Sequence, residues 1–586
     1  MYSSHFSLLA ISCCLSFAAQ ANPAMQLQQI FKQDWEMQLR LYPDMASRIG
    51  DTRFNHLLPK TSLAALRAER AHDAKMLRKI KRIPRTSLQG QDVLSYDLFI
   101  YEKEQLLREA QFYPYSIYPL NTNEGLHSDL LKLVEISPFA NTRDYRNYLA
   151  RLRAVGPYVA GVQEQLDYGI KHGWLAPKVI VYDMPRQLRE LAAQVEQSSL
   201  GQPIREMPAH FTSAQKKLYT AQIKQALQQQ VRPALEKIAH YMEKTYVPAS
   251  RDSIAASSLP GGPKYYEFLA ANLTTTNQTP DEIHQLGLSE VARIQAQMRE
   301  VMQKTGFQGS LSEFFTKLTT DPQFFYTKQE DLLAGYRELM QRAHVQMPRF
   351  FGRLPKGKVE IKAVPEVGAE NQGGAYYEGG SIDGSRPGYF VANTSRLEIR
   401  PKWEMATLTM HEAEPGHHLQ STLAQEMPNM PDFRRFGWYN AFGEGWALYA
   451  EKLGKEMGFY DDPYALAGHL NGELFRAARL VVDTGIHSKG WSRQQAIDYL
   501  NANTASPPPD NIVEIDRYIA WPGQALGYKI GELKIMQLRQ QAQEKLGERF
   551  DIRQFHDAIL ENGGLPLAMV EEHMLRWQNR VLQSKK

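Results

Sequence analysis

Apolar side chains recur at helical spacing over most of the chain. In residues 25–43 and 142–173 they stand at positions i, i+3, i+4 and i+7, which is the pattern of amphipathic helices. Proline and glycine interrupt the pattern, as in residues 112–125, and mark where helices end. Thr279, which is followed by proline and two acidic residues, has the surroundings of a helix start. The pattern predicts a mainly α-helical protein.

Residues 358–400 have a different pattern of residue types. Short β-branched and aromatic runs alternate there with glycine and proline, which predicts a small β-sheet. Helical periodicity then resumes and continues nearly to the C terminus. A chain of 586 residues is too long for one simple core, so we expect a two-lobed protein. The most linker-like stretch, 247–266, separates an N-terminal helical region (22–250) from a second region (251–586).

The N terminus has the pattern of a secretory signal peptide. An apolar run over residues 6–18 precedes a small-x-small site that ends at Ala21. We therefore expect cleavage after Ala21 and a periplasmic or secreted protein. Lipoprotein anchoring at Cys13 is the less favoured alternative, because Ala10 stands where leucine is usual. No later apolar run is long enough to span a membrane as a helix.

The composition limits the chemistry that the mature chain can use. Cys13 and Cys14 lie inside the predicted signal peptide and are the only cysteines, so a metal site has to use histidine and carboxylates. The net charge of +4 comes from interleaved acidic and basic residues. This distribution lacks the concentrated basic patch of a nucleic-acid-binding protein, so we expect no nucleic-acid partner.

The segment MHEAEPGHHLQ is similar to a zinc-protease motif that carries an insertion. The common motif has two histidine ligands four residues apart, with a glutamate after the first. Here His411 and Glu412 are followed by Pro415 and two late histidines. Pro415 removes a helical hydrogen bond and clashes with the preceding turn, so we expect a kink or bulge that brings His417 to the ligand position. His418, which shares a face with His411 in a regular helix, is the alternative.

A hydrolytic zinc site needs three protein ligands, an open position for water and a base. The segment FGEGWALYAEKLG supplies Glu444 among apolar residues, and a buried carboxylate needs a metal ion or a partner. An ion pair with an arginine is the alternative explanation. We predict that His411, His417 and Glu444 bind one Zn²⁺ per chain. Glu412 is the predicted base, and helices within residues 402–454 carry the site.

Side chains further along the sequence could assist hydrolysis. His487 could donate a hydrogen bond to the oxyanion that forms when water attacks a carbonyl, and so could the hydroxyls of Tyr518 and Tyr528. Cationic side chains nearby could hold a peptide carboxylate. These candidates are Arg476, Arg479, Arg517 and Lys529. Taken singly, each of these residues more often has a structural role.

Several segments together resemble the bacterial family called domain of unknown function 885, over nearly the whole mature chain. They are YPDMASRIGD, SLPGGPKYYEFLAANLTTTNQTPDEIHQLGLSEVARIQAQM, HEAEPGHHLQ, FGEGWALYAEKLG, VDTGIHSKGWSRQQAIDYL and RYIAWPGQALGYKIGELK. The family looks like a distant relative of zinc metallopeptidases with a glutamate as third ligand, which implies a mostly helical fold around a deep cleft. The resemblance implies that His411 and Glu412 are ligand and base and that Glu444 is the third ligand. The segment DTGIH is similar to the one in thermolysin that carries its transition-state histidine, which points to His487.

The sequence thus predicts an exported zinc-dependent peptidase of the carboxypeptidase or oligopeptidase type, acting on short peptides. Glu412 would accept a proton from water and pass it to the leaving amine. Two alternatives stay open: a metal-dependent hydrolase of another amide or ester, and a metal-free periplasmic binding protein or chaperone. The oligomeric state is left open.

Overall fold

The computed structural model describes residues 22–122, 125–364, 369, 373–382, 384 and 386–584. The predicted signal peptide, its cleavage site after Ala21 and Cys13 lie outside these residues. The described chain is mainly α-helical with one small sheet, which confirms the predicted fold class. Among its helices, none combines the length and the apolar character needed to cross a bilayer.

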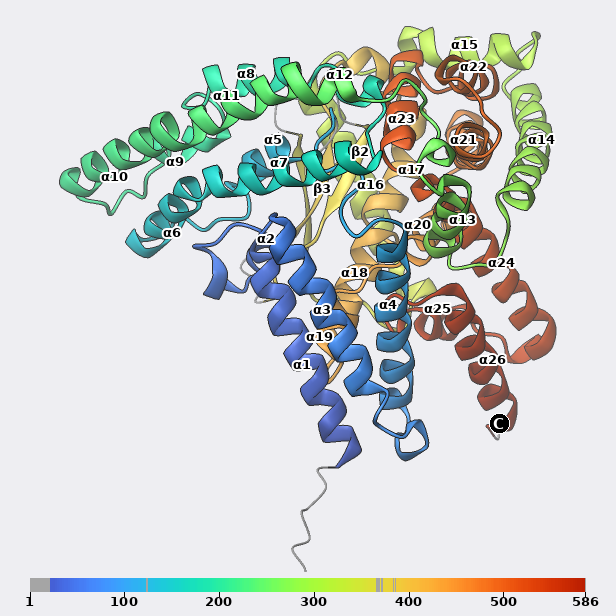
Figure 1. Ribbon diagram of the computed structural model, residues 1–586. Helices are drawn as coiled ribbons and strands as arrows, with labels where there is room; N and C mark the ends of the chain where they lie inside the picture. The colour runs from blue at the N-terminus through green and yellow to red at the C-terminus, as the bar shows by residue number, and fades with distance from the viewer. Residues whose placement is uncertain are drawn as a thin grey trace, which may run out of the picture.

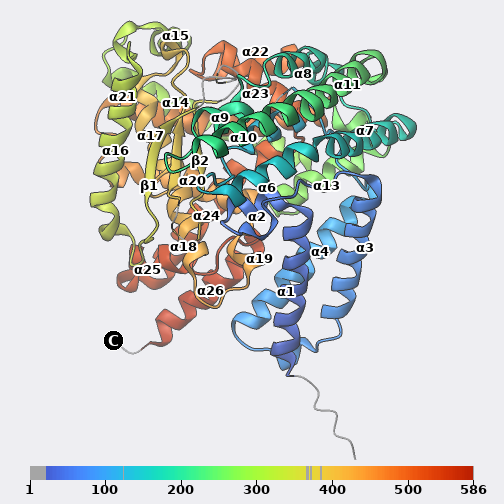
Figure 2. The same ribbon diagram turned by 90° about the vertical axis from the view of Figure 1, so that its left-hand side faces the viewer.

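The N-terminal part of the chain is built of short and medium-length helices. They are α1 Pro23–Leu41, α2 Pro43–Arg48, α3 Leu63–Ile80, α4 Gln91–Phe112, α5 Leu126–Lys132, α6 Thr142–Arg153, α7 Val155–His172, α8 Met184–Ala193, α9 Gln202–Arg205, α10 Ser213–Ala226, α11 Arg232–Tyr241 and α12 Val247–Ala249. Helices α1, α3 and α4 run side by side and project from the body of the molecule, whereas α6 to α11 form an elongated layer on one side of it (Figures 1 and 2).

The remainder of the chain carries the longest helices. They are α13 Gly262–Thr274, α14 Pro280–Lys304, α15 Leu311–Thr320, α16 Gln329–Phe350, α17 Met405–Glu412, α18 His417–Glu426, α19 Asp432–Arg435, α20 Asn440–Glu456, α21 Pro463–His487, α22 Arg493–Asn503, α23 Pro508–Ala520, α24 Gly527–Leu546, α25 Ile552–Leu560 and α26 Leu567–Gln583. The predicted start at Thr279 is confirmed, since its side chain accepts from the backbone of Glu282 and that glutamate bonds back to Thr279.

The predicted sheet within residues 358–400 has three strands. They are β1 Val359–Ala363, β2 Ala375–Glu378 and β3 Gly388–Ala392, in the order β1-β3-β2. The central strand β3 is parallel to β1 and antiparallel to β2. Tyr336 of α16, Phe390 of β3 and Met405 of α17 share one small apolar core, so the sheet lies beside α17, as Figures 1 and 2 show.

Two large apolar cores hold the helices together. The first contains Tyr145 and Leu474, and the second contains Phe99 and Trp446, so each core joins residues from both sides of position 250. The proposed boundary at residue 250 stays a prediction, and neither core is confined to one side of it. Helices α17, α20 and α21 contact one another. Helix α20 contributes to the second core and α21 to the first, so their contact is where the two cores meet.

The stretch 247–266, interpreted as a linker, is not one in the structure. Ala256 has no exposed surface, and its N–H donates to Nδ1 of His487. Tyr266, almost fully buried, donates its hydroxyl proton to Asp483. The serine, glycine and proline content signalled turns correctly, but the turns pack against α21 instead of connecting two independent bodies.

Glycines permit the close crossing of α20 and α24. A β-carbon at residue 531 would lie 1.8 Å from the carbonyl oxygen of Ala441, and one at residue 445 would lie 2.5 Å from the Cα of Gly531. Such distances are far inside van der Waals contact, so only glycine fits at both positions. The crossing fixes the two helices that carry Glu444 and Tyr528.

We expect Gly531→Ala to lower the free energy of unfolding by roughly 1–3 kcal/mol, because the added methyl group forces two helix backbones apart. Thermal and chemical denaturation measure the change. Gly156→Ala in α7 is the matched control, since a β-carbon there meets no atom within 4 Å and alanine is favoured in helices. Equal stability of Gly531→Ala and wild type would contradict the close crossing.

Candidate metal centre

The predicted bulge at Pro415 is a full interruption of the helix. Helix α17 ends at Glu412 and α18 begins at His417, and the peptide bond between Glu414 and Pro415 is cis. A β-carbon at Gly416 would lie 1.8 Å from the carbonyl oxygen of His411. The start of α18 therefore rests directly on the end of α17, and this contact requires glycine.

The interruption brings the predicted ligands together. Nε2 of His411 lies 3.5 Å from Oε2 of Glu444, and Nε2 of His417 lies 3.4 Å from the same oxygen. One potential ligand atom from each of the three residues lies within 4.8 Å of the other two. All three side chains are buried. We call His411, His417 and Glu444 the triad.

The triad has the geometry and the unmet bonding capacity of a metal site. Two ligands about 2.1 Å from a shared tetrahedral centre lie about 3.4 Å apart, which matches both nitrogen-to-oxygen distances. Oε2 of Glu444 is buried and makes no hydrogen bond with any described residue. Its two imidazole contacts, at 3.5 and 3.4 Å, are longer than good hydrogen bonds, so the residues present fit a divalent cation between them.

The surroundings of the triad favour positive charge. Nδ1 of His411 donates to Oε1 of Glu451 over 2.7 Å, which leaves Nε2 directed to the triad. Burial alone would lower the pKa of His411, but the carboxylates of Glu444 and Glu451 raise it to about 9. Burial would likewise raise the pKa of Glu444, but His417 and His411 hold it well below its usual range. Arg476 lies 3.6 Å from Oε1 of Glu451 and partly balances the excess negative charge.

Glu412 is the acid next to the triad. It is buried on the last turn of α17, directly after His411. Its carboxylate makes no hydrogen bond with any residue in the described part of the chain, whereas Glu414 two positions later is paired with His344 at 2.9 Å. Glu412 thus has an unpaired carboxylate beside the triad.

His418, the alternative ligand, faces the sheet instead. Its Nε2 donates to the carbonyl oxygen of Gly357, and its Nδ1 accepts from the hydroxyl of Tyr377 on β2. Burial lowers the pKa of His418 to about 4, so it stays neutral. Of the two adjacent histidines, the structure brings His417 to the triad and gives His418 a structural position.

His487 does not have the environment expected for an oxyanion donor. It has no exposed surface. Its Nδ1 accepts from the N–H of Ala256, and its Nε2 donates to the carbonyl oxygen of Tyr518. A neutral imidazole has one N–H, which is already used here, so the predicted role is replaced by a structural one.

Tyr518 and Tyr528 differ in whether the hydroxyl proton is free to bond to an oxyanion. The hydroxyl of Tyr518 donates to Oε2 of Glu514 and accepts from Nε of Arg479, so its proton is not free for an oxyanion. The hydroxyl of Tyr528 accepts a long bond of 3.4 Å from Gln524 and has no acceptor among the described residues. Burial raises the pKa of Tyr528, and the nearby charge of Glu444 raises it further. Tyr528 is therefore the protonated hydroxyl close to the triad.

The four predicted cations separate into different environments. Lys529 has no exposed surface, and its Nζ is bound by Glu473, Glu532 and Glu290, which excludes it from substrate contact. Arg476 forms an ion pair with Glu451. Arg479 and Arg517 both contact Glu514.

Trp438 is a residue of the site that the sequence did not reveal. Its ring centre lies 5.7 Å from that of His417, and it is 50% exposed. A β-carbon at Gly443 would lie 2.3 Å from the indole, so this glycine lets the ring lie against α20 next to Glu444. No spacing signal identifies Trp438. The sequence does contain a spacing signal for Glu451, because this residue stands seven positions after Glu444 and so on the same helix face.

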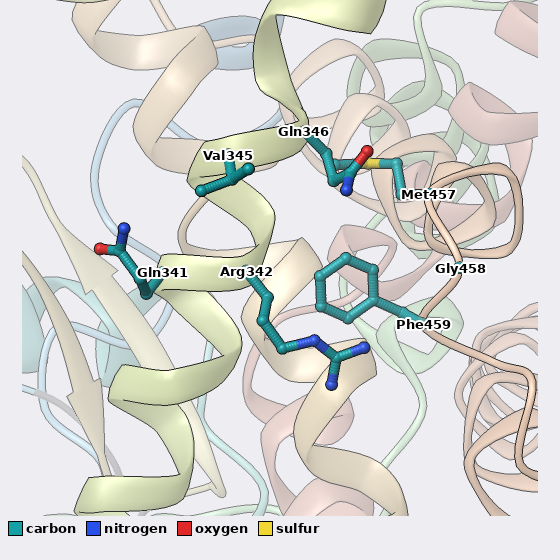
Figure 3. Close-up of a pocket in the computed structure, with 7 residues that line it drawn as sticks. All are labelled: Gln341, Arg342, Val345, Gln346, Met457, Gly458 and Phe459. Atoms are coloured by element: carbon teal, nitrogen blue, oxygen red, sulfur yellow. The ribbon is translucent and has the colours of Figure 1, made fainter.

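A surface cavity of about 330 Å³ has no member of the triad in its lining, and Figure 3 shows the residues that do line it. It is lined by Gln341, Arg342, Val345, Gln346, Met457, Gly458 and Phe459. The guanidinium of Arg342 stands 4.7 Å from the ring centre of Phe459. No histidine or carboxylate lines this cavity, so it offers no metal or acid–base chemistry.

Fold and site define a mainly α-helical protein that buries a two-histidine, one-glutamate cluster beside a small sheet. The chain belongs to the family described as bacterial protein of unknown function (DUF885), whose model matches residues 43–574. It is similar to a candidate lipoprotein from Colwellia psychrerythraea, with 29% identity and a TM-score of 0.91 over 95% of this chain and 100% of that one. A candidate lipoprotein of unknown function from Shewanella oneidensis shares the fold, with 18% identity and a TM-score of 0.66 over 94% and 99%. The chain matches no curated protein.

We expect His487→Gln to lower stability by an amount that shrinks as the pH falls. Burial lowers the pKa of His487 to about 3, against about 6.5 in the unfolded chain. Between these values the unfolded state binds a proton that the folded state does not, so wild-type stability falls with acidification, by roughly 2 kcal/mol at pH 5. The variant has no imidazole at this position, so its stability lacks this pH dependence. The stability difference between wild type and variant therefore becomes smaller as the pH falls.

Denaturant titrations at pH 8 and pH 5 measure the difference between variant and wild type. The exposed His240 in α11 provides the control variant His240→Gln. A difference that is the same at both pH values would contradict the neutral, buried state of His487.

Proposed function

We propose that the protein is an exported metal-dependent hydrolase of amide bonds, with short peptides as substrates and zinc as its ion. The observation that carries the proposal is the convergence of Nε2 of His411, Nε2 of His417 and Oε2 of Glu444, with the last atom buried and without a hydrogen bond to any described residue. A bound ion there would act as a Lewis acid on a carbonyl and would lower the pKa of water.

The residues of the chain have distinct tasks in this proposal. Glu412 accepts a proton from the attacking water and transfers it to the leaving amine. Tyr528 donates its hydroxyl proton as a hydrogen bond to the oxygen that becomes negative. Glu451 holds the imidazole of His411 in one tautomer and orientation, which is the usual task of a carboxylate behind a ligand histidine.

The proposal includes export from the cytoplasm. The signal-peptide pattern supports it, and so does the likeness to two candidate lipoproteins. Cleavage after Ala21 is the route we favour, and lipid attachment at Cys13 is the alternative. Mass spectrometry of the mature N terminus distinguishes them.

We expect one zinc ion per chain in the purified mature protein and none in His411→Ala. Elemental analysis after dialysis measures both. Glu412→Gln should keep the ion and the fold and lose about 10²- to 10⁴-fold in kcat on a peptide mixture analysed by mass spectrometry, because proton transfer contributes this much. Glu456→Gln, whose acid pairs with Arg539 at the far end of α20, is the control.

The same experiment separates the alternatives. Zinc without peptide cleavage would favour a hydrolase of another amide or an ester. Absence of zinc from the wild type, even after reconstitution, would refute the hydrolase and favour a binding protein or chaperone.

We expect Glu451→Gln to weaken zinc binding about 10- to 100-fold, because the amide no longer holds the ring of His411 as a carboxylate does. Competition with a chromophoric chelator measures the affinity. Glu456→Gln lies on the same helix and removes the same charge, so it should bind zinc like the wild type. Equal affinity of the two variants would show that Glu451 does not support the site.

A further inference from the structure

A partly buried polar network adjoins the triad on the side of Tyr528. Oε2 of Glu514 in α23 accepts hydrogen bonds from Arg479 of α21 over 3.1 Å, from Arg517 over 2.9 Å and from the hydroxyl of Tyr518 over 2.7 Å. One carboxylate thus joins two guanidiniums and a tyrosine. We call Arg479, Arg517, Glu514 and Tyr518 the arginine network.

The arginine network has one more positive charge than negative. Burial would raise the pKa of Glu514, but Arg517 and Arg479 lower it to about 2, so this acid is ionised. Asp483 also acts electrostatically on Arg517, but its oxygens are held by Tyr266 and by the N–H of Gly523. Burial raises the pKa of Asp483 to about 7, which reduces its charge at neutral pH. The surplus charge is only partly buried, but the network has more positive charge than its own carboxylate balances, so it has room for one anion.

The network also has unused hydrogen-bond donors. A guanidinium has five N–H donors. Arg479 uses two in bonds to Tyr518 and Glu514, and its Nη1 is buried without a partner among the described residues. Arg517 uses two in bonds to Glu514 and Gln524. The side chain of Arg517 is 22% exposed, so a ligand can reach the network from this side.

Two short connections link the network to the triad. The guanidinium of Arg479 lies 4.3 Å from the ring centre of Tyr528, whose hydroxyl is influenced by the charge of Glu444. Gln524 accepts from Arg517 and donates to Oδ1 of Asn440, which stands one turn before Glu444 on α20. The surplus charge is therefore connected to the helix that carries Glu444 through Gln524 and Asn440, and it lies against the ring of Tyr528.

We propose that Arg479 and Arg517 bind the C-terminal carboxylate of a peptide substrate, so that the enzyme removes the last residue as a carboxypeptidase does. This proposal rests on the proposed hydrolase. Water adds its oxygen to the last peptide carbonyl and the C–N bond breaks. The released amino acid takes up the proton at its amine, and the shortened peptide keeps a new carboxylate. The planar guanidinium matches a carboxylate in two parallel hydrogen bonds.

Binding to the zinc-loaded Glu412→Gln protein tests the proposal without requiring turnover. The probes are N-acetylated dipeptides with varied C-terminal residues, each as the free acid and as the C-terminal amide, measured by calorimetry. We expect the preferred acid to bind about 10- to 100-fold more tightly than its amide, which is typical for a charge-assisted bond in a buried site. Adding Arg517→Gln should reduce the acid to the affinity of the amide.

Two further variants control the experiment. Arg479→Gln should have the same effect as Arg517→Gln, and thermal melting confirms that each variant is folded. Arg493→Gln removes an arginine that pairs with Asp516 outside the network, so it should leave the preference intact. If no acid binds more tightly than its amide, or if the preference survives in both network variants, the proposal is overturned.

The two proposals fail in different ways. Loss of the proposed peptide hydrolase would appear as a wild-type protein that binds no zinc, or that binds zinc and cleaves no peptide. Loss of carboxylate recognition alone would appear as a zinc-loaded protein that cleaves peptides but binds acid and amide equally.

Discussion

The candidate site depends on one backbone contact, between Gly416 and the carbonyl oxygen of His411. A β-carbon at residue 416 would lie 1.8 Å from that oxygen, so no other residue lets α18 begin so close to the end of α17. The contact turns a six-residue separation along the chain into adjacent imidazoles, with ring centres 4.8 Å apart. The indole N–H of Trp446 donates to the carbonyl oxygen of Pro415 and anchors the interruption to α20. Since α20 also carries Glu444, one helix fixes the turn and supplies the third member of the triad.

The electrostatics of the region separate into two neighbouring parts of opposite sign. Around the triad, the carboxylates of Glu444, Glu451 and Glu412 outnumber the guanidinium that pairs with them among the described residues, that of Arg476. Beyond Tyr528 the arginine network has the opposite excess. A cation in the first part and an anion in the second would each offset a local imbalance. A substrate with a carbonyl close to its own carboxylate would satisfy both parts at once, whereas either part alone favours only a simple ion.

The sequence predicts what short-range patterns determine. Helical periodicity, the capping residues at Thr279 and the β-branched runs of the sheet are local, and the structure has these elements where they were expected. His411 and Glu444 could also be identified from the sequence, because a histidine beside a glutamate and a carboxylate within an apolar helix are unusual in themselves. The choice between His417 and His418 could not be made from the sequence. It depends on how the backbone passes Pro415 and on the hydrogen bond of His418 with Tyr377, 41 residues earlier.

His487 shows most clearly what the sequence could not predict. Its segment is similar to one that carries a catalytic histidine, but its role is decided by the partners of its two nitrogens. One partner, the N–H of Ala256, lies 231 residues away in a stretch interpreted as a linker. Lys529 was misjudged for the same reason, because the acids that surround it come from α14, α21 and α24. Trp438 reaches His417 only because Gly443 leaves room for its ring.

The bonding of the buried acids favours a hydrolase over a binding protein. Glu414 is paired with His344, Glu451 with His411 and Glu514 with two arginines, so each has a structural reason to be buried. Glu412 has no such partner among the described residues, and its oxygens are not among the fully enclosed unpaired atoms, so its carboxylate keeps contact with solvent. A hydrolase needs the acid unpaired, because a carboxylate already held by a cation is a weaker base, and strained or unsatisfied groups concentrate where chemistry requires them.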